Sequence, residues 1–98
     1  MWHLYVLRTS EDRLYTGIAK DVTRRLAEHE GGLGKGAKAL RSRGPFTLEY
    51  TVPLGDRSLA LKAEYALKQL SRSAKESLVE QSPDREGLLE RLGLVGLD

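Results

Sequence analysis

Residues 14–29, LYTGIAKDVTRRLAEH, decide the fold of this chain, because they join a short strand to a helix. The apolar and aromatic residues 14–18 are typical of a β-strand. Asp21 is a good N-cap for the following helix, which we expect to run to about Glu30, where two glycines end it. The apolar stripe of this helix consists of Val22, Leu26 and Ala27.

A second strand is predicted just upstream, at residues 2–8 (WHLYVLR). The polar residues 9–13 favour a turn, so the two strands are expected to form a hairpin. The register that we predict pairs residues whose numbers have an even sum, and side chains alternate between the two faces. One face then carries Tyr5, Leu7, Tyr15 and Gly17, and the other carries Leu4, Val6, Leu14, Thr16 and Ile18.

The rest of the chain is predicted to add one strand and further helices. A short helix at residues 37–42 precedes a third strand at 46–52 (FTLEYTV) and a turn at 53–55. The predicted helices that follow are one capped by Asp56 or Ser58 and ending near Leu70, one capped by Ser71 or Ser73 and ending near Gln81, and one opening at Ser82-Pro83 and ending near Gly93. The order ββα(α)βααα predicts a single α/β (α+β) domain over residues 1–98.

Composition excludes several classes of protein. The absence of cysteine rules out disulfides and thiolate metal sites. The sequence has neither an apolar run long enough for a membrane span nor a secretory start, so we expect no membrane partner and a cytoplasmic location. The net charge of +2 is mild, but residues 31–44 hold four basic and no acidic residues: Lys35, Lys38, Arg41 and Arg43. Such a stretch suits a phosphate-rich ligand, or it is a solvated loop.

Arg25 and His29 are spaced i, i+4 and therefore project from one side of their helix. At the border of the core, an arginine can hold a phosphate and a histidine can move a proton near neutral pH. The alternative is a surface arginine and a histidine at a helix end. Tyr5 and Tyr15 are expected on one face of the hairpin, where they are either packing residues or phenols of a site. Gly17 on that face leaves room for a ligand or for a close helix.

Glu64 is the most informative acid, because three of its four neighbours one helical turn away are apolar. A carboxylate at such an edge is costly unless it is paired or bound to a cation. It therefore either holds Mg²⁺ together with water and phosphate, or forms a salt bridge with Lys68 or Arg25. A zinc site is excluded, since the chain has two histidines, no cysteine and no close ligand pair. The glycines after residue 30 do not match a phosphate-binding loop.

In order along the chain, HLY at 3–5, YTG at 15–17, Arg25, His29 and Glu64 resemble the motifs of the GIY-YIG endonuclease superfamily. The segments LYTGIAKDVTRRLAEHEGG, KGAK at 35–38 and LKQLSRSAK at 67–75 resemble a small stand-alone bacterial branch of it, the UPF0213-like proteins. The resemblance covers about residues 2–80, with a C-terminal helical extension at about 82–93. It departs from the namesake motif at His3, where the motif has glycine.

The resemblance implies a small three-stranded antiparallel sheet flanked by helices and a metal-dependent endonuclease that hydrolyses DNA phosphodiester bonds. It assigns Tyr5 and Tyr15 to the site lining, Arg25 to the phosphate, His29 to proton transfer or orientation, and Glu64 to Mg²⁺ (or Mn²⁺). With no separate DNA-binding domain, we expect a structure-selective or weakly specific nuclease in DNA repair or processing. The expected partner is nucleic acid, DNA in preference to RNA. The rival hypothesis is a non-catalytic nucleic-acid-binding module that uses the same phosphate pocket.

Overall fold

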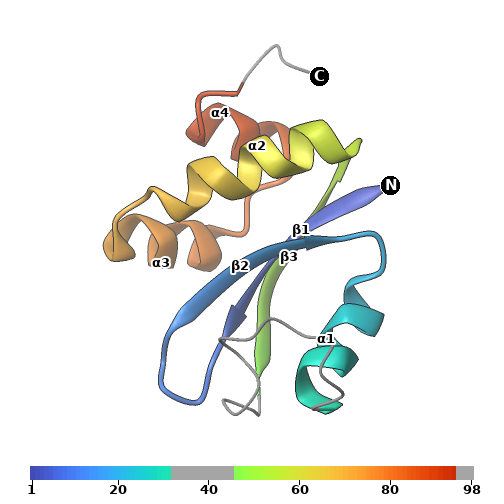
Figure 1. Ribbon diagram of the computed structural model, residues 1–98. Coiled ribbons are helices and arrows are strands. Elements are labelled where there is room, and N and C mark those ends of the chain that lie inside the picture. The colour runs from blue at the N-terminus through green and yellow to red at the C-terminus, as the bar shows by residue number, and fades with distance from the viewer. Residues whose placement is uncertain (32–45, 95–98) are drawn as a thin grey trace.

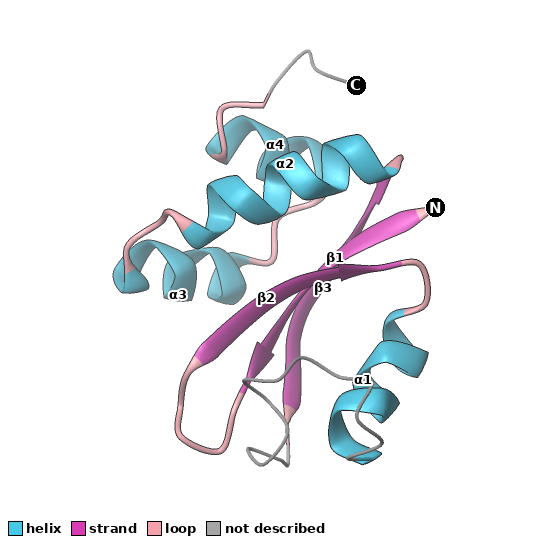
Figure 2. Cartoon of the chain, in the orientation of Figure 1, coloured by secondary structure: helices cyan, strands magenta, loops and turns pink. Residues whose placement is uncertain are grey.

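The computed structural model describes residues 1–31 and 46–94 of the chain (Figure 1; Figure 2). The strands are β1 (Trp2–Arg8), β2 (Leu14–Ala19) and β3 (Thr47–Gly55). The helices are α1 (Val22–Gly31), α2 (Arg57–Lys68), α3 (Arg72–Gln81) and α4 (Arg85–Arg91). The predicted element order and α+β class are confirmed, and the short helix predicted at residues 37–42 lies outside the described residues.

The sheet is antiparallel with the order β2-β1-β3, so the first strand of the chain lies in the middle. Strand β1 pairs with β2 in the predicted register. Tyr5 lies opposite Gly17, and Leu7 lies opposite Tyr15. Because a slip by one residue would move every side chain to the other face, this register decides which residues can form a site.

The two faces of the sheet pack against different helices, with α1 on one side and the three later helices on the other (Figure 1). The large core, under α2, α3 and α4, consists of Leu4, Val6, Tyr50, Val52, Leu54, Leu59, Ala60, Ala63, Leu67, Leu78, Leu88 and Leu89. The small core, under α1, consists of Tyr5, Leu7, Ala19 and Phe46, with Tyr15, Val22 and Leu26 packed against it. The predicted separation of the hairpin faces is therefore confirmed.

Two predicted boundaries are wrong. The turn predicted at residues 53–55 is part of β3, which continues through Pro53 to Gly55. Proline is tolerated there because β3 is an edge strand, whose outward amides need no partner, and the next residue, Leu54, is buried in the large core. The last helix does not open at Pro83. Asp84 is its N-cap and accepts a hydrogen bond from the Gly87 amide at 2.8 Å, while Ser82 ends α3 in a left-handed conformation.

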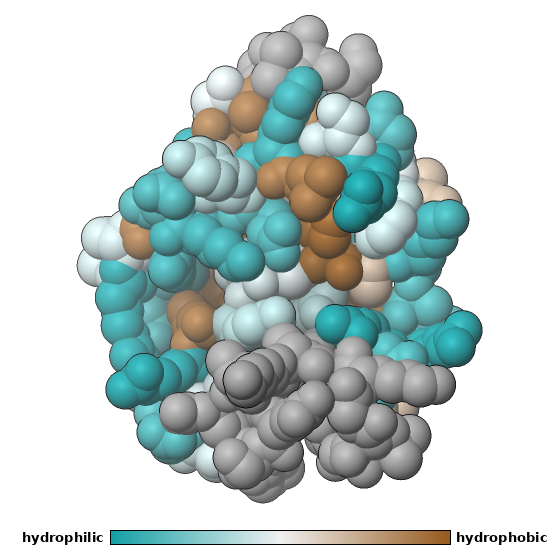
Figure 3. Space-filling view, viewed as in Figure 1, coloured by the Kyte–Doolittle hydropathy of each residue, from teal (hydrophilic) through white to brown (hydrophobic). Residues whose placement is uncertain are grey.

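The surface of the described part is mainly polar. The large apolar side chains exposed on it are Met1, Leu48, Leu61 and Tyr65. On the face drawn in Figure 3, hydrophobic residues form only small separate patches between hydrophilic ones. Among the described residues, no helix is long and apolar enough to cross a membrane.

Arg8, at the end of β1, ties the hairpin to the rest of the fold. Its guanidinium contacts Glu76 of α3 at 2.6 Å, Asp12 of the turn at 2.7 Å and Glu49 of β3 at 3.0 Å. Arg72 also contacts Asp12 and Glu76, at 3.2 and 3.1 Å. Charge-assisted hydrogen bonds of this kind are the strong ones, so this network fixes α3 against the hairpin end of the sheet.

The network predicts a loss of stability in acid. Hydrogen bonds from Arg8, and then from Arg72, lower the pKa of Glu76 from 4.5 to about 2. A depressed folded-state pKa contributes stability above the unfolded pKa, which is lost as pH falls through the folded one. We therefore expect the free energy of unfolding to fall between pH 4.5 and about 2. In urea titrations across this range, Glu76→Gln should flatten the pH dependence, whereas Glu80→Gln on the same helix should not.

Candidate active site

Tyr5 is the centre of the candidate site. It is only 2% exposed, on the central strand, directly opposite Gly17 on β2. A Cβ atom added to Gly17 would lie 2.5 Å from the Tyr5 hydroxyl and 2.6 Å from its Cζ. The room that the sequence predicted at Gly17 is thus filled by the Tyr5 ring. Glycine is required at this position because a side chain would occupy the same space as the phenol.

Tyr5 interacts with three other predicted site residues. Burial raises the pKa of Tyr5 to about 12, and the charges of Tyr15 and Glu64 add to the rise. A hydrogen bond with Arg25 and the arginine charge act in the opposite direction. The fold thus brings three of the other predicted residues, Tyr15, Arg25 and Glu64, close enough to act on Tyr5. At neutral pH the Tyr5 phenol is protonated and can donate a hydrogen bond.

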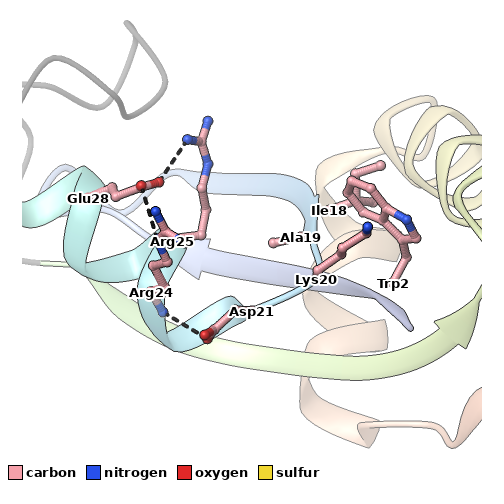
Figure 4. Close-up of a pocket in the computed structure, with 8 residues that line it drawn as sticks. All are labelled: Trp2, Ile18, Ala19, Lys20, Asp21, Arg24, Arg25 and Glu28. Carbon is pink, nitrogen blue, oxygen red and sulfur yellow. Dashed lines mark hydrogen bonds and ion pairs between the residues drawn. The ribbon is translucent and has the colours of Figure 1, made fainter.

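Arg25 extends from α1, whose first turn is fixed by Asp21. The Asp21 carboxylate accepts a hydrogen bond from the Arg24 amide at 3.0 Å, as predicted for the N-cap. The Arg25 side chain contacts Glu28 at 3.2 Å (Figure 4). Burial lowers the pKa of Arg25, but hydrogen bonds with Glu28 and Tyr5 outweigh it and raise the pKa overall. Arg25 is therefore a permanent cation held between an acid and a phenol.

Glu64 comes from α2. Its carboxylate forms an ion pair with Lys68 at 3.4 Å, which is one of the two salt bridges that the sequence suggested. The glutamate side chain is 21% exposed and the lysine side chain 48% exposed. A partly exposed ion pair is weak, so Glu64 can exchange Lys68 for another cation at little cost.

The Glu64 carboxylate suits a hard divalent metal ion. In the described part of the chain, no group of three or more His, Cys, Asp or Glu side chains is placed to hold an ion. Glu64 is a single carboxylate near Tyr5, and a single carboxylate suits Mg²⁺ because that ion keeps several waters and takes few protein ligands. The same hard oxygen ligands also suit Mn²⁺.

Several predicted residues are not placed by the structure. The backbone of His29 lies in α1, one turn beyond Arg25, but its side chain is outside the described part. The basic residues Lys35, Lys38, Arg41 and Arg43 also lie outside it. Their proposed roles at the site therefore stay predictions.

The structure adds residues that the sequence reasoning missed. Glu28 contacts both Arg25 and Arg24, the latter at 3.7 Å. The spacings i, i+3 and i, i+4 in the sequence already indicate these contacts.

A basic pocket of about 390 Å³ is lined by Arg13, Leu14, Arg72 and Lys75. These residues are up to 62 positions apart (75 minus 13), so no local pattern could group them. Nδ1 of His3 is buried and has no hydrogen-bond partner in the part that the structure describes.

Alkali is predicted to destabilise the protein through its buried phenols. Burial raises the pKa of Tyr5 and of Tyr50 from 10.0 to about 12. A raised folded-state pKa contributes stability that is full below the unfolded pKa and is lost as pH rises through the folded one. Between pH 10 and about 12 we expect roughly 2–3 kcal/mol to be lost for each phenol. Urea titrations should show a smaller loss for Tyr5→Phe, and an unchanged loss for Tyr65→Phe at the exposed position.

Comparison with known proteins identifies a family. The family model described as GIY-YIG catalytic domain matches residues 1–77. The UPF0213 protein YhbQ of Escherichia coli O139:H28 is 53% identical over 91 residues, which are 93% of this chain and 89% of that protein. A UPF0213 protein of Yersinia pestis is 58% identical over 83 residues, 85% of each chain. The UPF0213 protein BH0048 from Bacillus halodurans, which has a solution NMR structure, is 41% identical in sequence. The structural match has a TM-score of 0.54 and covers 83% of this chain and 85% of that one.

Proposed function

The chain belongs to the GIY-YIG catalytic domain family, and from this premise we propose that it is a metal-dependent endonuclease that hydrolyses DNA phosphodiester bonds. The observation that carries the proposal is the cluster of Tyr5, Tyr15, Arg25 and Glu64, built from two strands and two helices. A cation can stabilise the charge on a phosphodiester, a carboxylate can hold a metal ion, and phenols can orient phosphate or water through hydrogen bonds. We further propose that it acts in the cytoplasm, in DNA repair or processing, with weak sequence specificity.

Arg25 is the residue we assign to the scissile phosphate. Its guanidinium can hold two phosphate oxygens and stabilise the charge that develops on them. Tyr5 positions it, because the buried phenol and the arginine share a hydrogen bond. Glu28 holds the arginine from the other side at 3.2 Å and must give up part of this contact when phosphate binds.

Tyr15 is the phenol that substrate can reach, since it is partly exposed whereas Tyr5 is buried. We assign Tyr15 to the attacking water, and His29 to proton transfer or orientation. Glu64 would hold Mg²⁺ or Mn²⁺. A divalent ion there would supply positive charge to the phosphate and to the water. It would also reverse the effect of the Glu64 charge, which now raises the pKa of Tyr5.

Basic residues away from the reacting phosphate would hold the rest of the substrate. We propose this role for Lys35, Lys38, Arg41 and Arg43, and for the pocket of Arg13, Arg72 and Lys75. Each phosphate contact releases counterions, so binding should weaken steeply as salt rises. Arg13→Gln and Lys75→Gln should each reduce the slope of log affinity against log salt concentration by about the contribution of one phosphate contact.

The function is tested by incubating the protein with supercoiled plasmid, duplex, flapped and single-stranded DNA in Mg²⁺, in Mn²⁺ and in EDTA. We expect nicked or cut products with either metal and none in EDTA. DNA binding without products on every substrate and with both metals would contradict the endonuclease and leave the rival, a non-catalytic nucleic-acid-binding module. The same assay on RNA measures the proposed preference for DNA.

A further inference from the structure

A pocket of about 380 Å³ adjoins the candidate active site, at the end of the sheet where β2 leads into α1 (Figure 4). Ala19 lies between two groups of side chains: Arg24, Arg25 and Glu28 extend from α1, while Trp2, Ile18 and Lys20 gather on the other side. Its volume is within the range of small-ligand sites in proteins, which runs from about 300 to 1,000 Å³. Arg25 lines this pocket and also contacts Tyr5, so the pocket and the active site share one residue.

Trp2 gives the pocket an aromatic wall. The indole packs against the large core, which fixes one part of the side chain, and it remains partly exposed toward the pocket. Lys20 Nζ lies 5.6 Å from the centroid of its ring, and Arg57 Cζ lies 5.7 Å from it. Cations at this distance are attracted to the ring face, but each sits at the end of a long flexible stem. Either can therefore move off the ring and leave it open to a planar group.

The charges around the pocket favour an anionic ligand. Lys20, Arg24 and Arg25 line it, and Arg57 adds a fourth cation at the indole. Of the two acids in the lining, Asp21 caps α1 and Glu28 is paired with both arginines. The pocket thus combines an aromatic surface with an excess of positive charge. Proteins that bind single-stranded nucleic acid use this combination, with bases stacked on aromatic side chains and the backbone held by cations.

We propose that this pocket binds an unpaired nucleotide next to the scissile phosphate, with the base against Trp2 and its phosphate at Lys20 and Arg24. The inference rests on the proposed function, because it places the nucleotide beside the phosphate that Arg25 holds. A base inside a duplex is stacked on its neighbours and cannot offer its face to the indole. The substrate class is therefore DNA with an unpaired strand at the cleavage point, such as a flap or a single strand.

The first experiment uses the protein without any substitution. Trp2 is the only tryptophan of the chain, so its fluorescence reports on this pocket alone. In EDTA, a short oligothymidylate should quench the emission saturably, and an abasic oligomer of the same length and charge should bind about tenfold more weakly without quenching. The inference is overturned if the two oligomers bind equally, or if neither changes the Trp2 emission.

A matched set of variants tests the same point by fluorescence anisotropy of a labelled oligothymidylate. Trp2→Leu should weaken binding about tenfold, Trp2→Phe should weaken it less because a ring is kept, and Tyr65→Leu should have no effect. Tyr65 is an exposed aromatic outside the pocket lining and controls for the loss of a ring. Equal affinity for all three variants and the unsubstituted protein overturns the inference.

The fluorescence result separates this inference from the proposed function. Quenching that discriminates against the abasic oligomer, in a protein that cuts no DNA in Mg²⁺ or Mn²⁺, supports the nucleotide pocket and contradicts the nuclease. Cleavage of flapped and fully paired DNA at equal rates, with no response of Trp2, supports the nuclease and contradicts the pocket.

Discussion

Glu64→Gln is expected to reduce the rate of metal-dependent DNA cleavage by about 10²–10³-fold. The carboxylate is the proposed metal ligand, and an amide of nearly the same shape has no charge with which to hold Mg²⁺. Helix α2 should form normally, because Glu64 is partly exposed and its only ion pair in the described part is with Lys68, also partly exposed. The initial cleavage rate and the affinity for Mn²⁺, measured by calorimetric titration, should therefore fall together, with little change in stability.

The matched control for this substitution is Glu90→Gln, at an exposed position of α4, which should cleave as the unsubstituted protein does. Substitution of Glu64 also removes a negative charge that raises the pKa of Tyr5. The phenol should then titrate at lower pH in an absorbance titration, even without metal. An unchanged cleavage rate in Glu64→Gln would rule out the metal role.

Gly17→Ala is expected to cost about 1–3 kcal/mol of stability and most of the activity. The added methyl group would lie 2.5 Å from the Tyr5 hydroxyl, so the ring has to move, and Tyr5 is buried in the small core. A displaced phenol also loses its hydrogen bond with Arg25, which would disorder the residue that we propose to bind phosphate. Urea unfolding and cleavage assays measure the two effects.

Tyr5→Phe separates packing from chemistry at this position. It keeps the ring that fills the space over Gly17 and removes only the hydroxyl. We expect stability close to that of the unsubstituted protein and a fall in cleavage rate, because Arg25 is no longer positioned. If Gly17→Ala is as stable and as active as the unsubstituted protein, the close approach of Tyr5 to Gly17 has no functional consequence.

The sequence predicted the half of the candidate site that is built from nearby residues. In the register that we assumed, which the structure confirms, strand alternation placed Tyr5, Tyr15 and Gly17 on one face. The apolar stripe of α1 placed Arg25 at its border. These are local signals, because each depends on a spacing of two to four residues. The predicted C-terminal end of β3 is wrong because Pro53 indicates a turn when only the local sequence is considered. The structure shows that β3 is an edge strand, and an edge strand can contain a proline.

The remaining features depend on contacts between distant residues. Arg8 contacts Glu49, which is 41 positions away in the sequence, and Glu76, which is 68 positions away. No pattern in the sequence links these residues. Trp2, Lys20 and Arg57 meet because the first strand, the end of the second and the start of α2 lie at the same end of the sheet. The apolar neighbours of Glu64 and the family resemblance both singled out this residue, but its proximity to Tyr5 follows only from the packing of α2.

The unequal size of the two cores has a consequence for how the protein opens. Among the side chains that the structure describes, helices α2, α3 and α4 contribute buried residues to the large core, whereas α1 contributes the partly buried Val22 and Leu26 to the small one. Segments with few buried contacts open without global unfolding. Amide hydrogens of α1 should therefore exchange with deuterium long before those of α2. Because Arg24, Arg25 and Glu28 belong to α1, a bound nucleotide should slow that exchange selectively, which would make α1 a substrate-stabilised element.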